Sequence, residues 1–336
     1  MSVPLATKGL AAATPSFQIA KAWHVLPWAL ALVFYFTAGG YLSLGTHVLI
    51  MILFALSLDL ALGVAGIITL GHAAFFGFGA YAAGILAARL SNDPLLGLAV
   101  ATLLTGLFGA LVGMLILHTA GVTLMMLTLA ISALLAEFAN QAHWLTGGDD
   151  GLQVGRMAPL FGLFRFDLWG HTAYLYATAV LFLWSLAAWR IMRSPFGRSL
   201  DGIRQNPRRM RAIGTPVWRR LVVAYGLSAA MAGTAGALEA QTTRAVGLGA
   251  LGVLASGTVL VMLILGGTRR TYGAFVGATV YVVVQDIAAQ IDPFRWMFVV
   301  GILLMAVVLF LENGLMGFPE AARRVLRGSR PRSGGR

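Results

Sequence analysis

The sequence contains no cysteine among its 336 residues, so it can form neither a disulfide bond nor a thiolate metal site. Charged residues are also scarce, at 11% of the chain, whereas soluble domains average about a quarter. With 59% hydrophobic residues, this composition predicts a polytopic membrane protein. The net charge of +12 then reports topology rather than binding to nucleic acid.

Motifs for catalysis and nucleotide binding are missing as well. The chain has no G-x-x-x-x-G-K-[ST] phosphate loop, so it does not bind ATP in that manner. It also has no H-E-x-x-H motif and no G-x-S-x-G nucleophile elbow. His72 and His118 have no neighbouring ligand set, and we predict no metal site. These absences favour a transport subunit over an enzyme.

Apolar segments with the length of a membrane-spanning helix recur along the chain. We count about ten of them, each near the roughly 20 residues that a span requires, which predicts an all-α transmembrane bundle. They cover residues 25–43, 46–65, 71–90, 95–117, 121–140, 172–191, 219–240, 250–267, 271–291 and 294–312. The 46–90 region is the least regular because glycines interrupt it.

The distribution of positive charge predicts the orientation of these spans. The long polar stretch 194–220 is rich in arginine and holds a single acid, Asp201. If it is cytoplasmic, ten spans place both termini inside, as the positive-inside rule favours. We therefore expect a cytoplasmic tail over 1–24, a membrane domain over 25–317 and a basic cytoplasmic tail over 318–336. Residues 1–22 also lack the apolar core and cleavage site of a signal peptide.

The stretch 194–220, within a predicted cytoplasmic loop over 192–220, has the signals of an ordered element. Ser194-Pro195 predicts a turn, 196–205 a short helix, and Asn206-Pro207 the start of another helix that stops at Gly214. Four apolar residues recur at helical spacing and would form one stripe between arginines: Leu200, Ile203, Met210 and Ile213. We interpret the loop as a docking element; the alternative is that it is only a topology signal.

A second informative stretch, 58–84, is rich in glycine. Gly63 and Gly66 mark a weak point in one span, and a helix restarts at residues 70–72. Broken helices at membrane depth are tolerated where they are buried in protein or line a path. The candidate residues for a translocation path are Asp59, Gly63, Gly66, Gly71, His72, Gly77, Gly79 and Glu137. The alternative is close helix packing, which glycine also permits.

Ionisable residues within apolar spans are costly and each should face a partner, water or the path. The sequence places five in the predicted spans: Asp59, His72, Glu137, Glu239 and Asp286. Asp59, Glu137 and Glu239 are the better candidates, because Asp286 lies near a predicted boundary. They would form either a proton relay or interhelical hydrogen bonds.

The predicted outer loop, over 142–171, contains a tight turn of glycines and aspartates. Its residues are Gly147, Gly148, Asp149 and Asp150. The turn would present carboxylates or backbone N–H groups to a partner, or it is simply solvated.

Several stretches in this order resemble the inner-membrane permeases of branched-chain amino acid ABC importers of the LivM type. The resemblance covers about 44–317, and its stretches are LALGVAGIITLGHAAFFGFGAYAAG, GVTLMMLTLA, LTGGDDGL, SPFGRSLDGIRQNPRRMRAIG, LSAAMAGTAGAL, VLVMLILGGTRRTYGAFVGA and ENGLMG. One departure is Thr268-Arg269-Arg270, where many relatives have small or apolar residues.

The resemblance implies a multi-pass permease in the bacterial inner membrane, paired with a second, homologous permease. Two cytoplasmic ATPase subunits would bind the ATP, and a periplasmic binding protein would deliver the substrate, so this chain needs no cofactor. The positions that match the family's ATPase-coupling segment are Phe196, Gly197, Arg198, Leu200, Ile203, Arg204, Met210 and Gly214. Permeases for urea or short amides are the nearest alternative; a proton-coupled secondary transporter and an intramembrane enzyme are the others.

Overall fold

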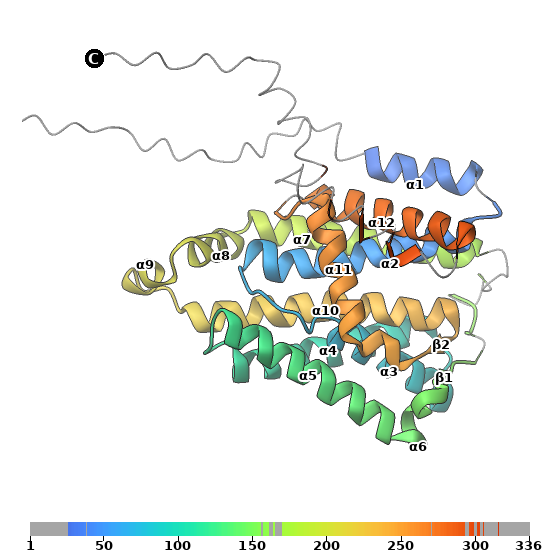
Figure 1. The fold of residues 1–336 in the computed structure, drawn as a ribbon, viewed down its shortest axis with the longest axis horizontal. Coiled ribbons are helices and arrows are strands. Elements are labelled where there is room, and N and C mark those ends of the chain that lie inside the picture. Colours follow the sequence, from blue (N-terminus) through green and yellow to red (C-terminus); the bar gives the residue numbers. More distant parts are fainter. Residues whose placement is uncertain are drawn as a thin grey trace, which may run out of the picture.

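The computed structural model describes residues 26–37, 39–155, 157–160, 164, 170–269, 271–292, 296–298, 301–302, 305 and 315. This part of the chain is a bundle of long helices joined by short connections (Figure 1). The first half contains α1 (Leu26–Thr37), α2 (Leu42–Leu58), the π-helical η2 (Asp59–Val64), α3 (Ala73–Arg89), α4 (Pro94–Ile116), α5 (Val122–Gln141), α6 (His143–Thr146), η3 (Gly148–Asp150) and β1 (Leu152–Gln153). The second half contains α7 (His171–Arg193), α8 (Pro195–Gln205), α9 (Pro207–Ala212), α10 (Val217–Thr243), β2 (Ala245–Val246), η4 (Leu248–Leu251), α11 (Val253–Gly266) and α12 (Thr271–Ile291).

Six of the described helices are long and apolar enough to cross a membrane. They are Leu42–Val64, Pro94–Ile116, Val122–Gln141, His171–Arg193, Val217–Thr243 and Tyr272–Ile291. α1, α3 and α11 are apolar but shorter. The helical, multi-pass character predicted from the sequence is therefore confirmed. The tenth predicted span, 294–312, lies mostly outside the described residues, and the total of about ten spans stays a prediction.

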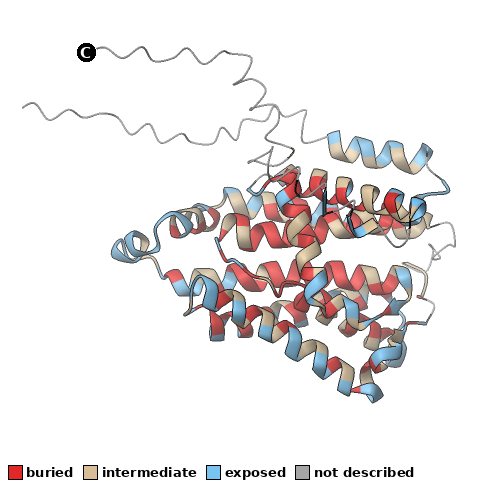
Figure 2. Cartoon of the chain, in the orientation of Figure 1, coloured by how far each residue is buried: buried red, intermediate tan, exposed pale blue. Residues whose placement is uncertain are grey.

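α10 forms the centre of the bundle because its small residues let neighbouring helices approach closely. It packs most extensively against α4 and α3, and also against α2. A Cβ on Gly79 would overlap the main chain of Gly233, and a Cβ on Gly236 would overlap the Phe76 carbonyl. Small residues at helix crossings are what van der Waals packing in a membrane requires. Figure 2 shows the buried residues of α10 and α2 in red.

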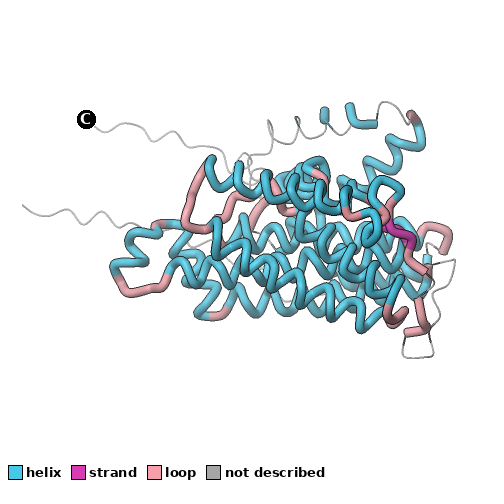
Figure 3. Tube along the Cα trace, turned by 90° about the horizontal axis from the view of Figure 1, so that it is seen from below, coloured by secondary structure: helices cyan, strands magenta, loops and turns pink. Residues whose placement is uncertain are grey.

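The two ends of the bundle carry different structures. α8 and α9 project at one end, whereas α6, β1 and β2 lie at the other (Figures 1 and 3). At the second end, Leu152 pairs with Val246 and Gln153 with Ala245 in a short antiparallel ladder. The arginine-rich loop and the glycine–aspartate turn are thus at opposite ends of the helices, and their placement on opposite sides of a membrane stays a prediction.

Candidate functional site

The arginine-rich loop folds into α8 and α9 through local capping. The Ser194 hydroxyl accepts a hydrogen bond from the Gly197 N–H at 3.2 Å, and Pro195 occupies the first turn of α8. Asn206 ends α8 and caps α9, accepting from the Arg209 N–H at 3.0 Å. Gly214 then adopts a φ of +83°, which favours glycine. The predicted ordered element is confirmed.

α8 lies against α7, η2 and α10, and its apolar residues attach it to them. Leu200 is 0% and Ile203 is 3% exposed, and both belong to the main core of the bundle. Gly197 is equally constrained, because a Cβ there would overlap the main chain at the end of α7. Ile213, in contrast, is 69% exposed. The expected single stripe is therefore divided: Leu200 and Ile203 hold α8 to the chain's own helices and do not face outward.

The outward surface of α8 and α9 is polar and basic. Its exposed residues are Arg198, Arg204, Gln205, Asn206, Arg208, Arg209 and Arg211. Phe196 and Met210 are half-buried against the core. Arg220 donates from its guanidinium to the Ser199 hydroxyl and so ties the start of α10 to α8. Any partner that meets this end of the bundle meets positive charge first.

A chain of polar contacts links α8 to two other elements. Asp201 on α8 accepts from the Arg269 side chain at 2.6 Å. The backbone N–H of Arg269 in turn donates to the Asp59 carboxylate in η2 at 2.9 Å. Arg269 has a φ of +66° in the turn between α11 and α12. Arg269 thus connects the arginine-rich element to a buried acid.

Arg204 makes the second connection between α8 and η2. Its guanidinium donates to the Gly63 carbonyl at 2.6 Å. Its aliphatic stem lies over Gly66, where a Cβ would come within 2.8 Å of it and where φ is +74°. Burial and the neighbouring Arg269 charge lower the pKa of the Arg204 guanidinium, while Asp201 and Asp59 oppose this shift. Two arginines and two aspartates therefore form one compact network.

The second predicted span is broken where the sequence indicated. α2 widens into the π-helix η2, and residues 65–72 are not helical. The free backbone groups find partners on other helices: the Leu70 N–H donates to the Thr128 hydroxyl at 3.2 Å, and the Ala73 N–H donates to the Ser256 hydroxyl at 2.9 Å. Such rescue is what allows irregular backbone at membrane depth. Single π-helical turns within α-helices are frequent at functional sites.

The predicted path residues divide between packing and exposure. Asp59, Gly63, Gly71, His72, Gly77 and Gly79 are all buried. His72 Nε2 lies 2.9 Å from the Ser57 hydroxyl, so it joins α3 to α2. Gly66 and Glu137 are exposed, and Glu137 accepts from Gln141 of its own helix at 2.8 Å. Packing accounts for the buried glycines, and a path-lining role for any of the set stays a prediction.

The predicted outer turn forms as expected. Gly147 and Gly148 have φ values of 80° and 59°, and both aspartates that follow are exposed. The residue before the turn, Thr146, is fixed by its hydroxyl, which donates to the Ala142 carbonyl at 2.9 Å. Contact between Asp149 or Asp150 and a partner stays a prediction.

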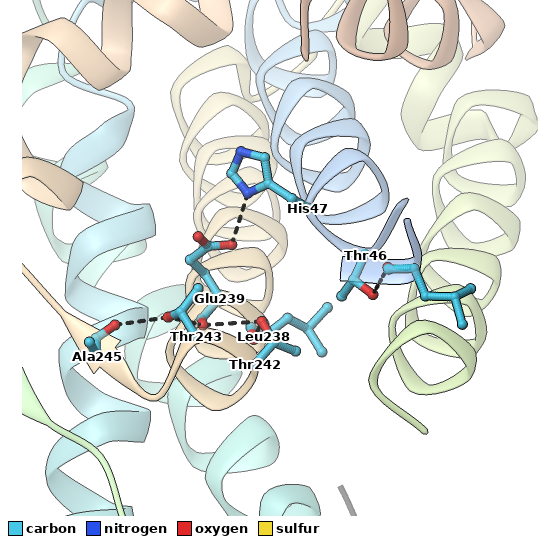
Figure 4. Close-up of polar contacts among 8 residues, drawn as sticks. Thr46, His47, Leu238, Glu239, Thr242, Thr243 and Ala245 are labelled. Atoms are coloured by element: carbon cyan, nitrogen blue, oxygen red, sulfur yellow. Dashed lines mark hydrogen bonds and ion pairs between the residues drawn. The ribbon is translucent and has the colours of Figure 1, made fainter. Parts of the chain in front are cut away.

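One pair was missed from the sequence. His47 on α2 lies with Nδ1 at 3.4 Å from Oε2 of Glu239 on α10 (Figure 4). The sequence prediction includes Glu239 as an acid within a span and omits His47, an ionisable residue within another span. The same reasoning about ionisable groups in apolar helices would have found it. Within the part of the chain that the structure describes, no group of three or more His, Asp or Glu residues is placed to hold a metal ion.

A cavity of about 350 Å³ lies among α3, α4 and α5, within the usual size range of ligand pockets. Its walls include Phe78, Ile85, Leu104 and Leu135, and most of its other lining side chains are also apolar. A zwitterionic solute would lose its hydration there without charged partners, so the cavity does not suit an amino acid.

Comparison with known families decides the class of the chain. The family model described as "Branched-chain amino acid transport system / permease component" matches residues 40–308. The chain belongs to this permease family. It is 24% identical over 311 residues to the "High-affinity branched-chain amino acid transport system permease protein LivM" of Escherichia coli (strain K12), covering 86% of this chain and 73% of the relative. It is 25% identical to the protein of the same name from Salmonella typhimurium (strain LT2), covering 82% and 70%. No solved structure shows significant similarity to the chain.

In this permease, the positions predicted for ATPase coupling lie in α8, in α9 and in the turn after α9. Arg198 is on the exposed side of α8, Arg204 reaches from α8 to the Gly63 carbonyl, Leu200 and Ile203 are on the anchored side of α8, and Gly214 follows α9. The structure also joins Arg204 and Asp59, which the sequence had placed in two separate groups of candidates, through η2. The outer turn is at the other end of the bundle.

Proposed function

We propose that this permease forms half of the membrane path of an ATP-driven importer in a bacterial inner membrane. Its substrates are branched-chain or related amino acids. A second, homologous permease completes the path, two ATPase subunits bind to the cytoplasmic end, and a periplasmic binding protein delivers the substrate. The membership of the permease family and the similarity to the two LivM proteins of branched-chain amino acid transport support this proposal.

The observation that carries the proposal is the position of α8 and α9. This pair of helices is attached to the spans by buried side chains and presents a basic surface at one end of the bundle. We expect that surface to contact the ATPase subunits. The buried attachment makes α8 a rigid extension of the membrane helices rather than a flexible tether.

Movement of α8 would then reach the spans through the polar network. Asp201 connects to Arg269 in the α11–α12 turn, and Arg204 connects to Gly63 in the break of α2. A rigid-body displacement of α8 by closing ATPase subunits would shift both elements together. Such a coupling requires only that the network differs between two states of the permease.

The test uses the assembled complex in proteoliposomes. Charge reversal at Arg208 and Arg211 should release the ATPase subunits on purification and abolish leucine-stimulated ATP hydrolysis, because acidic side chains at these positions would repel a partner that binds a basic surface. The matched control replaces Asp149 and Asp150 by Asn at the opposite end, where ATPase binding should be unchanged. Full ATPase retention in the reversed variant would refute the docking surface.

The same assay separates the alternatives for substrate and energy source. Uptake of urea or a short amide in place of leucine would indicate the related specificity within the family architecture. Uptake by this chain alone, driven by a pH gradient without ATPase subunits, would indicate a secondary transporter.

A further inference from the structure

The His47–Glu239 pair occupies a distinctive position in the bundle. Its two side chains point toward one another from α2 and α10, which are the most buried of the span-length helices described (Figure 4). Both residues lie in the half of their helix nearer to β1 and β2: His47 is in the first turns of α2, and Glu239 is near the end of α10. The pair is therefore at the end of the bundle opposite to α8.

This pair is open rather than sealed. The side chains of His47 and Glu239 are 40% and 22% exposed. The separation of 3.4 Å is longer than the roughly 2.7–3.2 Å of a good N–H···O hydrogen bond. A carboxylate can accept about four hydrogen bonds, so this contact leaves much of the capacity of Glu239 unused.

Lipid would be a costly cover for the exposed side of this pair. A carboxylate or an imidazole facing acyl chains is costly, and ionisable groups within spans face water, one another or the interior of an assembly. The neighbouring polar groups add to this character: the Thr243 hydroxyl donates to the Glu239 carbonyl at 2.7 Å and lies 3.0 Å from the Ala245 carbonyl in β2. The surroundings of Glu239 thus become more polar toward the outer end.

We propose that His47 and Glu239 line an aqueous vestibule open to the outer side, and that the Glu239 carboxylate binds the ammonium group of the amino-acid substrate. This inference rests on the proposed import of amino acids. An ammonium group brings three donors and a positive charge, and its hydrogen bonds to a carboxylate are charge-assisted. His47 lies beside the carboxylate on α2. A neutral amide or urea would gain no such contact, so the pair would favour amino acids over these substrates.

The first experiment tests whether the vestibule contains water. The natural chain has no cysteine, so His47→Cys and Glu239→Cys each introduce a unique thiol. In oriented proteoliposomes holding the whole complex, both thiols should react with a membrane-impermeant maleimide added from outside. The control variants Leu103→Cys and Leu107→Cys are on α4, where the native side chains are 67% and 64% exposed on an apolar surface, and they should not react. Absence of labelling at both 47 and 239 would overturn the proposal.

The second experiment tests the ligand. Leucine should slow labelling of His47→Cys, whereas 4-methylpentanoate, which is leucine without its ammonium group, should not. Adding Glu239→Gln should weaken this protection by about ten- to a hundredfold in leucine concentration, the loss expected when a hydrogen bond to a charged group is removed. If Glu239 has only a structural role, Glu239→Gln will leave the protection of the thiol by leucine unchanged. That outcome would overturn the proposal.

These outcomes are distinguishable from failure of the proposed function. If ATP-driven leucine uptake is absent while labelling and protection occur, the importer assignment fails and the site remains. If uptake is normal, leucine gives no protection, and Glu239→Gln leaves the apparent KM for the leucine-loaded binding protein unchanged, the site fails and the importer assignment remains.

Discussion

Asp59 and Glu239 are both acids within apolar spans, yet the structure surrounds them in opposite ways. Asp59 is 1% exposed and accepts from the Arg269 N–H, with Arg204 bound one turn away at Gly63. Glu239 is partly exposed and has a long contact with one histidine. Both residues are identified from the sequence by the same principle, that an acid within an apolar span needs a partner, water or a place in the protein interior. Tertiary contacts decide whether the acid is paired within the chain, as Asp59 is, or faces out of it, as Glu239 partly does.

The same contrast holds for the two ends of the permease. At the end with α8, buried apolar residues and the polar network join four elements, α8, η2, α10 and the α11–α12 turn. At the other end, the helices finish in short turns and a two-residue ladder, and the acids are open. We interpret the first end as built to transmit displacement and the second as built to receive solute.

The most damaging change should be at the anchored face of α8. Replacing Leu200 and Ile203 together by Asp removes two buried apolar side chains, each contributing roughly 1.5–3 kcal/mol, and buries two carboxylates that cost several kcal/mol more. Because both residues pack within the chain, the permease itself should lose thermal stability, before any question of partner binding. Fluorescence-detected thermal unfolding of the purified permease measures this, with Ile213→Asp on the exposed side as the control. A stable double variant that only fails to bind the ATPase would show that these residues face the partner instead.

A smaller but distinct loss should separate the two acids. Asp59→Ala leaves the Arg269 N–H without its acceptor, and an unsatisfied buried group costs about 1–3 kcal/mol, more beside charges. Glu239→Ala should change stability by less than about 0.5 kcal/mol, as is usual at sites without such features. Thermal unfolding of the two variants in parallel measures the difference. Equal destabilisation by Asp59→Ala and Glu239→Ala would contradict the difference between a buried, paired Asp59 and a partly exposed Glu239.

Smaller still is the expected effect on stability of breaking the Asp201–Arg269 ion pair. Both side chains are more than a third exposed, and exposed pairs contribute about 0–1 kcal/mol. Asp201→Asn should therefore leave unfolding nearly unchanged while reducing leucine-stimulated ATP hydrolysis, if the pair transmits movement. A double-mutant cycle with Arg269→Gln isolates the pairwise contribution. Additive effects of the two variants on ATP hydrolysis would exclude a coupling role for the pair.

The local structure of the arginine-rich element was predictable because caps and stops act over a few residues. Ser194, Asn206-Pro207 and Gly214 each perform the role that their residue types favour. The break near Gly63 was likewise predicted from Gly63 and Gly66, although glycines alone do not break a helix, because Gly77, Gly79 and Gly84 lie within the continuous α3. Its partners, Thr128 and Ser256, were not, because they lie far along the chain.

Helical periodicity could not tell which surface the apolar residues of α8 meet. Leu200 and Ile203 have the same spacing whether they pack against the chain's own core or against another subunit. The contact between His47 and Glu239 is also tertiary, with 192 residues between the two positions. The family resemblance fixed the class of the protein, and the orientation of its termini stays a prediction from the arginine distribution.

The smallest expected effect concerns the exposed arginines of α9. Arg208→Ala with Arg209→Ala should leave thermal stability within about 0.5 kcal/mol, because surface substitutions rarely do more. Retention of the ATPase should fall modestly at physiological ionic strength, and the difference from the unaltered permease should disappear as salt rises, since the Debye length shortens from about 8 Å at physiological ionic strength to about 3 Å at 1 M and screens the two arginines. Co-purification across a salt series measures this. If the loop is only a topology signal, retention of the ATPase will not depend on salt in the natural permease or in the Arg208→Ala, Arg209→Ala variant. A cysteine at position 205 will then become accessible from outside when both arginines are lost, because the positive charge that keeps the loop cytoplasmic is reduced.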